Sequence, residues 1–169
     1  AIGQGELGCT PLQMANFAAT IANRGYYKIP HVVKRIHDRD SIDARFYEKH
    51  YTKVESRYFD PIVEGMYRAV NVDGGSARMA RIEGLDICGK TGTAQNPHGA
   101  DHSTFMCFAP RNHPKIAVSV YVENGRWGGV AAAPIASLIT ELYLTDTITR
   151  PELVDYVKNL QISYPYYGK

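Results

Sequence analysis

The sequence predicts an α+β fold in one domain, with an antiparallel sheet flanked by helices. Three apolar segments, at about 85–95, 102–109 and 115–123, have the composition of strands. The turns between them are short, and they require antiparallel pairing because a parallel connection needs a crossover of about a dozen residues or more. Helical periodicity precedes and follows these strands, and 169 residues suffice for a single core.

A first helix is expected at about 11–23. Thr10, Pro11 and Gln13 form its start: a capping threonine, a proline at the first helical position and a glutamine three residues after the cap. Gly25 stands where a C-terminal cap is expected. Apolar residues at helical spacing predict one buried stripe: Met14, Phe17, Ala18 and Ile21.

Residues 31–37 and about 44–54 are β-branched and aromatic with many charges, and they predict a half-exposed hairpin around the polar turn Asp38–Ser41. A second helix is expected next, because Asp60 and Pro61 repeat the pattern of cap and proline. Residues 71–75 end it. One of its faces is apolar: Ile62, Val63, Met66, Tyr67 and Val70.

Strict alternation over 116–123 predicts a strand with two unlike faces. Residues 104–109 are an almost continuous apolar run closed by Pro110, which predicts a strand buried on both faces in the middle of the sheet. The tail at 161–169 is expected to be weakly ordered. Pro134 is expected to open a last helix with this core-facing stripe: Ile135, Leu138, Ile139 and Leu142.

The composition excludes several classes of function. Hydrophobic residues make up 44% and charged residues 21%, as in an ordinary globular protein. The 19 basic and 17 acidic side chains are mixed along the chain, so there is no basic patch for nucleic acid. No run of about 18 apolar residues would span a membrane. Because the chain starts at Ala1 without an initiator Met, we expect a processed product or a piece of a longer protein, with any targeting signal upstream.

Neither a cofactor nor a metal is predicted. The three cysteines lie far apart in apolar surroundings without a C-x-x-C spacing, and are interpreted as small buried hydrophobes: Cys9, Cys88 and Cys107. His98, Asp101 and His102 are close in sequence, but a loop with Pro and Gly gives them no fixed facing geometry. They are interpreted as solvated turn residues.

The stretch GLDICGKT at 84–91 matches the phosphate-binding pattern G-x-x-x-x-G-K-T. Such a site needs a buried strand before its first glycine and a helix that starts at G-K-T. The preceding residues 76–83 are charged, and Gly92 followed by Asn96-Pro97 cannot propagate a helix. A nucleotide site is therefore excluded, and the stretch is interpreted as a strand.

Lys-Thr-Gly at 90–92, on an edge-facing strand, resembles a motif of the penicillin-recognising serine acyltransferases, and the resemblance implies a physical role for each residue. A cationic lysine, here Lys90, attracts the terminal carboxylate of a peptide or β-lactam, and a neighbouring hydroxyl binds that carboxylate through a charge-assisted hydrogen bond. A glycine, here Gly92, lets a substrate backbone approach the strand closely.

Several further segments resemble the transpeptidase domain of class B penicillin-binding proteins, above all the penicillin-binding protein 2 group of cell-elongation transpeptidases. The resemblance implies a partial penicillin-binding/transpeptidase (serine β-lactamase-like) domain, with 1–145 as its C-terminal half and 146–169 as a C-terminal extension. The segments follow the family's order: IGQGELGCTPLQMANFAATIANRG, FDPIVEGMYRAVN with GGSA, GKTGTAQ, TFMCFAP, KIAVSVYVEN and AAPIASLITELYL.

The resemblance implies a D,D-transpeptidase that cross-links peptidoglycan stem peptides by serine acyl transfer and binds penicillin. The family uses Ser-x-x-Lys, Ser-x-Asn and Lys-Thr-Gly. Here no serine has lysine three residues on or asparagine two residues on. In the family both missing motifs lie upstream of the segment seen here. The chain by itself is therefore expected to be inactive, because acyl transfer by this route needs the nucleophile.

The resemblance also implies roles for four residues. Lys90 would supply positive potential near the substrate carboxylate and the serine of Ser-x-Asn, and Thr91 and Thr93 would offer hydroxyls to that carboxylate. Gly92 would allow close approach, and the Thr93 amide would be one oxyanion donor. Lys90 and Thr93 are thus the candidate catalytic residues, while Trp127 is interpreted as a packing residue.

The resemblance places the parent, meaning the longer protein that would contain this chain, at the periplasmic face of the inner membrane, anchored by a segment absent here. Its partners would be stem peptides, β-lactams and cell-elongation proteins; this segment itself would contact no membrane. A half domain should expose apolar surface, so self-association of the chain is expected.

Two alternatives to this interpretation are open. One is a stand-alone, non-catalytic module that binds peptidoglycan peptides or a partner through the Lys90 strand. The other is a class D β-lactamase or a β-lactam sensor, which shares Lys-Thr-Gly but fits the IGQG and TPLQMA segments less well.

Overall fold

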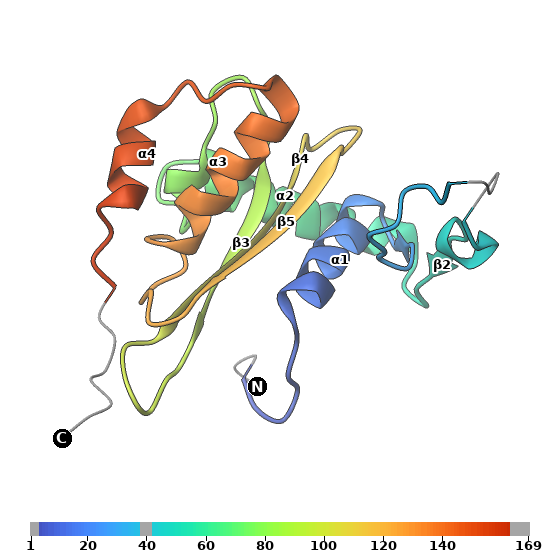
Figure 1. Ribbon diagram of the computed structural model, residues 1–169, viewed down its shortest axis with the longest axis horizontal. Coiled ribbons are helices and arrows are strands. Elements are labelled where there is room, and N and C mark those ends of the chain that lie inside the picture. Colours follow the sequence, from blue (N-terminus) through green and yellow to red (C-terminus); the bar gives the residue numbers. More distant parts are fainter. Residues whose placement is uncertain (1–3, 38–41, 163–169) are drawn as a thin grey trace.

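The computed structural model describes residues 4–37 and 42–162, and it places helices on both faces of a three-stranded sheet (Figure 1). The predicted α+β class is confirmed. Among the described residues, no helix has the length and apolar character needed to cross a membrane. The elements are α1 (Pro11–Ala22), β1 (Tyr26–Tyr27), β2 (His50–Tyr51), α2 (Asp60–Asn71), β3 (Cys88–Ala94), β4 (His102–Ala109), β5 (Ile116–Val122), α3 (Ala132–Thr145) and α4 (Pro151–Lys158).

The main sheet has the strand order β3-β4-β5, and both pairs are antiparallel. The predicted middle strand is confirmed: β4 places Met106 opposite Lys90 on one side and opposite Ser119 on the other. The first predicted strand begins at Cys88 instead of 85, because Ile82 and Leu85 pair in an isolated bridge before it. In this arrangement β3 is an edge strand with one long side open.

Separate apolar cores cover the two faces of the sheet. On one face, α3 and the short turn Arg78–Ala80 pack on Ile87, Phe105 and Cys107. On the other face, α1 and α2 pack on Cys88 and Phe108. Alternate residues of a strand point to opposite faces, so the neighbouring residues Cys107 and Phe108 of β4 contribute to different cores.

Helix α1 begins as predicted. The Thr10 hydroxyl accepts a hydrogen bond from the Gln13 amide (3.3 Å), and the Gln13 side chain accepts one from the Thr10 amide (2.8 Å). This capping box satisfies two amides that the helix cannot satisfy itself. The predicted buried stripe is wrong at Phe17, which is 52% exposed because it lines an open groove between α1 and α2.

Helix α2 starts one residue earlier than the cap pattern indicated. Asp60 is its first residue, Phe59 is the cap, and no side chain caps the helix. Asp60 instead forms an ion pair with Arg24 (3.2 Å). Of the predicted apolar face, Val63, Met66 and Val70 are buried, whereas Ile62 is 47% exposed in the same groove as Phe17.

The predicted hairpin of 31–37 with 44–54 is wrong. Residues 31–37 form no strand, Ala44–Phe46 form a 3-10 turn, and the ribbon that exists pairs β1 with β2. Strand propensity expresses a fit to neighbouring strands, and 31–37 are exposed with no strand beside them. The predicted turn Asp38–Ser41 lies outside the described residues, as does most of the tail predicted at 161–169.

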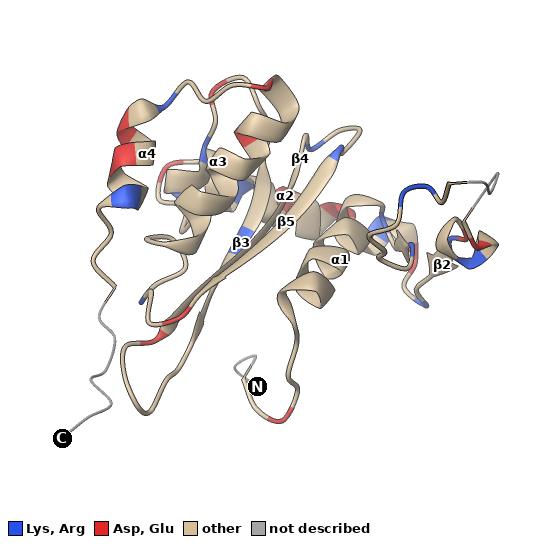
Figure 2. Cartoon of the chain, viewed as in Figure 1, with Lys and Arg blue, Asp and Glu red and all other residues tan. Residues whose placement is uncertain are grey.

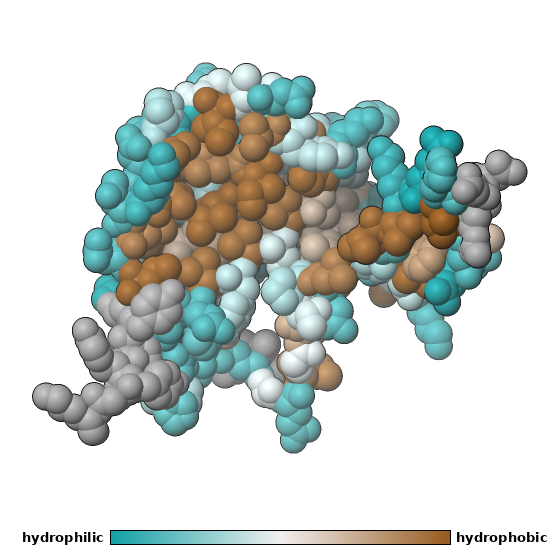
Figure 3. Space-filling model, viewed as in Figure 1, coloured by the Kyte–Doolittle hydropathy of each residue, from teal (hydrophilic) through white to brown (hydrophobic). Residues whose placement is uncertain are grey.

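The predicted core-facing stripe of the last helix is wrong at Ile139 and Leu142, whereas Ile135 and Leu138 are half-buried. Ile139 and Leu142 are 46% and 49% exposed, and Figure 3 shows apolar side chains gathered on the surface over α3. The reason is close approach, because small side chains bring a helix nearer to a sheet than branched ones do. The face of α3 toward the sheet is formed by Ala132, Ala133, Ala136, Ser137, Thr140 and Glu141.

Glu141 joins α3 to the segment that leads into α4. Its side chain is 2% exposed, and its carboxylate accepts hydrogen bonds from the Thr149 amide (3.0 Å) and hydroxyl (2.7 Å) and from Arg150 Nε (3.0 Å) and Nη2 (2.8 Å). Burial acts to raise the pKa of Glu141, but the hydrogen bonds from Arg150 and Thr149 outweigh it, so the pKa lies below its ordinary value.

We expect Glu141→Gln to lower the free energy of unfolding by about 3 kcal/mol, because the change removes the buried carboxylate and leaves the partly buried Arg150 guanidinium without its counter-charge. Urea unfolding at neutral pH measures the loss. Glu83→Gln, at an exposed position, is the control and should change stability by less than about 0.5 kcal/mol.

The loss should also depend on pH. A carboxylate with a lowered pKa stabilises the fold above its ordinary value of 4.5 and loses that contribution as the pH falls through the folded-state pKa. The gap between the two proteins should therefore shrink in acid. Equal stability at neutral pH would show that Glu141 does not hold the segment.

Candidate functional site

The Lys-Thr-Gly stretch lies on β3, at the edge of the sheet, and the strand runs through it to Ala94. No helix starts at Lys90-Thr91, which excludes the phosphate-binding alternative, because that site needs a helix N-terminus there. Lys90 is the basic position on β3 (Figure 2). The sequence prediction of an edge strand is confirmed.

Lys90 is exposed and has no carboxylate partner. Its Nζ donates a hydrogen bond to the Thr91 carbonyl oxygen (2.6 Å), and within residues 4–37 and 42–162 no acidic side chain forms an ion pair with it. The nearby Arg78, in contrast, is paired with Asp73 (3.0 Å). The positive charge of Lys90 is therefore available to an anionic ligand.

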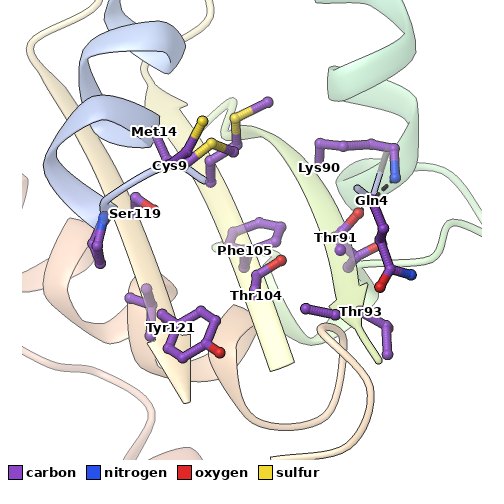
Figure 4. Close-up of a pocket in the computed structure, with 15 residues that line it drawn as sticks. Gln4, Cys9, Met14, Lys90, Thr91, Thr93, Thr104, Phe105, Ser119 and Tyr121 are labelled. Atoms are coloured by element: carbon purple, nitrogen blue, oxygen red, sulfur yellow. Dashed lines mark hydrogen bonds between the residues drawn. The ribbon is translucent and has the colours of Figure 1, made fainter. Parts of the chain in front are cut away.

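A hollow of about 400 Å³ lies against the three strands, with Lys90, Thr91 and Thr93 on one side and Ser119 and Tyr121 on the other (Figure 4). Thr104 and Phe105 of β4 lie between these sides. The segment before α1 borders the hollow with Gln4 and Cys9, and the Gln4 side-chain oxygen accepts a hydrogen bond from the Gln95 amide (2.9 Å).

A second, mostly apolar groove of about 870 Å³ lies between α1 and α2 and reaches Lys90 and Met106. Phe17 and Ile62, the two residues wrongly expected in the core, line it. Lys90 therefore stands where the groove meets the hollow on the strands. In the described chain this groove is open to solvent, and most of its lining side chains are apolar.

A third hollow, of about 360 Å³, lies beside Thr91 and Thr93 and is bordered by Ser76 and Trp127. The Thr91 hydroxyl donates a hydrogen bond to the Ser76 hydroxyl (3.3 Å). Trp127 is 70% exposed, so its interpretation as a packing residue is wrong. Gly128 and Gly129 were the sequence signal for this exposure. Glycines let the loop backbone lie close to β3, which leaves the indole side chain in solvent.

The Trp127–Val130 turn, closed by a hydrogen bond from the Val130 amide to the Trp127 carbonyl (2.9 Å), supports β3 from behind. A Cβ added at Gly128 would overlap the Thr104 carbonyl oxygen and lie 2.6 Å from the Gly92 carbonyl oxygen. The buried Ser103 hydroxyl donates to the Trp127 carbonyl (3.0 Å) and accepts from the Ala132 amide (3.0 Å). The backbone of the turn thus packs directly on the backbone of the Lys-Thr-Gly strand.

The cysteines divide into two kinds. Cys88 and Cys107 are buried as predicted, and desolvation raises the pKa of each thiol to about 12, which keeps them protonated and unreactive at neutral pH. The prediction is wrong for Cys9, which is exposed and borders the hollow on the strands. The backbone before α1 passes over the hollow, and sequence composition alone carried no signal of this.

The residues around the β3–β4 turn form hydrogen bonds within the turn and with the segment that follows β5. Asp101 accepts a hydrogen bond from the Asn96 amide (3.1 Å), and His102 Nδ1 accepts one from the Asn124 amide (3.1 Å). Throughout the part of the chain that the structure describes, no group of three or more His, Cys, Asp or Glu side chains is arranged to hold a metal ion.

Comparison with known proteins identifies the family to which the chain is similar. Residues 1–141 match the family model described as penicillin binding protein transpeptidase domain. A peptidoglycan D,D-transpeptidase MrdA of Haemophilus influenzae is 31% identical over 170 residues, covering 89% of this chain and 26% of that protein. The chain spans about a quarter to a third of the length of the curated relatives it matches.

Solved structures give the same fold. Pseudomonas aeruginosa PBP2 in complex with WCK 5153 superposes with a TM-score of 0.73 at 33% identity, covering 99% of this chain and 34% of that one. The complex between PBP2 and MreC from Helicobacter pylori superposes with a TM-score of 0.67 at 26% identity, covering 86% of this chain and 27% of that one.

We expect Gly128→Ala to lower the free energy of unfolding by about 1–3 kcal/mol, because the new methyl group overlaps main-chain atoms of β4 and stands against those of β3. Chemical unfolding measures it. Gly65→Ala in α2, where a Cβ meets nothing within 4 Å, is the control and should stabilise the helix by up to about 1 kcal/mol. A Gly128→Ala variant as stable as the wild type would contradict the close packing.

Proposed function

Because the chain belongs to the penicillin-binding protein transpeptidase family, we propose that it forms the carboxylate-recognising half of the active site of a peptidoglycan D,D-transpeptidase similar to penicillin-binding protein 2. The observation that carries the proposal is an edge strand whose lysine forms no ion pair within the described residues and which borders two hollows. We also propose the division of the chain into domains: residues 1–145 form the C-terminal half of the transpeptidase domain, and residues 146–169 form a C-terminal extension.

Each residue of the strand then has a defined role. Lys90 provides the positive potential that attracts the terminal carboxylate of a stem peptide or β-lactam, and Thr91 and Thr93 donate hydroxyl hydrogen bonds to it. The Thr93 amide is one donor of the oxyanion hole. Position 92 favours glycine, because a Cβ there would overlap the Thr104 hydroxyl. Without a side chain at this position, the substrate backbone can lie against the strand.

The reaction of the parent is serine acyl transfer. The serine oxygen bonds to the carbonyl carbon of the penultimate D-Ala, the D-Ala-D-Ala amide bond breaks, and D-Ala leaves with the proton. An acceptor amine then attacks the ester and regenerates the serine. This chain carries neither Ser-x-x-Lys nor Ser-x-Asn, so we infer that it recognises the substrate but is inactive alone.

The proposed setting is the periplasmic face of the inner membrane, where the substrate is made accessible to such enzymes, with the parent anchored by a segment outside this chain. Cell-elongation proteins are the proposed partners of the parent. The support is that one protein similar to this chain, the PBP2 of Helicobacter pylori, has been solved as a complex with MreC.

We also propose that the chain alone self-associates through the groove between α1 and α2. The groove is mostly apolar, and Phe17 and Ile62 on its two sides are about half exposed. Pairing two such grooves removes apolar surface from water, which stabilises the pair by about 25 cal/mol for each Å² that is buried.

We expect Lys90→Ala in the parent to slow acylation by penicillin about 10- to 100-fold, as the loss of one charge-assisted hydrogen bond and of its potential would. Fluorescent penicillin followed over time gives the rate. Lys115→Ala, an exposed lysine on the loop before β5, is the control. Unchanged labelling in Lys90→Ala would remove Lys90 from the site, and a wild-type parent that takes up no penicillin would overturn the proposed function.

We expect the isolated chain to sediment as a species larger than 18.8 kDa, and Ile62→Glu to shift it toward the monomer, because a charge in the groove opposes burial. Analytical ultracentrifugation measures both. Val32→Glu, at a residue that is 99% exposed and outside the groove, should change nothing. A wild-type monomer with a sharp thermal transition would contradict self-association.

A further inference from the structure

We propose that Tyr156 of α4 is a positioning residue for the substrate-binding strand, acting through the Trp127–Val130 turn. The inference rests on the proposed function and deepens it, since it gives residues beyond 145 a part in recognising the substrate carboxylate. It starts from α4, which lies beside α3 on the same face of the sheet, far along the sequence from Lys90 (Figure 1).

The start of α4 is held firmly. Glu141 fixes Thr149 and Arg150 by four hydrogen bonds, and Arg150 Nη1 also donates to the Arg81 carbonyl (2.9 Å). Arg81 follows the short turn Arg78–Ala80, which belongs to the core beneath α3. These hydrogen bonds fix the position of the first residues of α4. The direction in which the helix runs toward the Trp127–Val130 turn is therefore fixed as well.

The last turn of α4 reaches the loop behind β3. The Tyr156 hydroxyl donates a hydrogen bond to the Val130 carbonyl (3.0 Å). The turn is otherwise tied to β4 and α3, through Ser103 on the Trp127 carbonyl and through the Ala133 amide on the Gly128 carbonyl (2.9 Å). Within the described residues, Tyr156 supplies the hydrogen bond that holds the Val130 end of the turn from the outside.

Movement of this turn transfers to the substrate strand because the contact is between backbones. Gly128 lies against the Gly92 amide and carbonyl, and a Cβ at Gly129 would lie 3.9 Å from the Thr91 methyl and 2.6 Å from the Ser76 carbonyl. No flexible side chain lies between them to absorb a shift. Loss of the Tyr156 hydrogen bond should therefore loosen Thr91 and Gly92, the part of the strand assigned to the carboxylate.

The test uses the intact parent and compares its acylation rate with penicillin G and with the penicillin G methyl ester, whose carboxylate is masked. We expect Tyr156→Phe to slow acylation by penicillin G about three- to tenfold, the effect of one neutral hydrogen bond, and to change the ester rate by less than about twofold. The melting temperature should stay near that of the wild type. Tyr143→Phe, at an exposed tyrosine of α3, is the matched control.

The outcomes separate this inference from the function on which it rests. Selective loss with the acid supports Tyr156 as a positioning residue. Equal loss with acid and ester means that Tyr156 only stabilises the fold, and a Tyr156→Phe variant equal to the wild type means that the contact has no role; either result overturns the inference alone. A wild-type parent that is not acylated by penicillin G overturns the proposed function and this inference together.

Discussion

The contact between the backbones of the Trp127–Val130 turn and β3 is the constraint on which the site depends. An edge strand that is open to a ligand loses the support of a neighbouring strand on that side, so its position has to be fixed from its faces. Gly128 allows the main chain of the turn to lie on the main chain of β3 and β4, and the buried Ser103 hydroxyl holds the turn to β4. The small residues along α3 belong to the same arrangement, because the turn leads directly into this helix.

The two faces of the sheet differ in how completely helices cover them. On the α3 face the core is closed by small side chains and by the buried pair of Glu141 and Arg150, which carries the chain on into α4. On the α1 and α2 face an apolar groove stays open and ends at Lys90, whose charge has no partner in the described chain. This contrast supports the proposal that the edge strand recognises an anionic ligand while the nucleophile lies outside this chain.

The sequence predicted those features that depend on local patterns. Alternation and short turns gave the three main strands and their order, and Thr10 with Gln13 gave the start of α1. Patterns failed where long-range packing decides. Leu142 appeared to mark a core stripe, but α3 turns its small residues inward; 31–37 had strand composition and no neighbour to pair with. Within the site, Lys90-Thr91-Gly92 could be found as a motif, whereas the exposure of Cys9 and Trp127 depends on loop paths that no periodicity encodes.

We propose that this chain belongs to a protein that is acylated by penicillin, and that it recognises the substrate carboxylate within that protein. The most direct measurement uses an antibody raised against the chain to blot membranes of the source cell that have been treated with fluorescent penicillin. We expect one recognised band, larger than 18.8 kDa, that carries the fluorescence. A sole band of the size of this chain without fluorescence would contradict it and favour a stand-alone peptide-binding module.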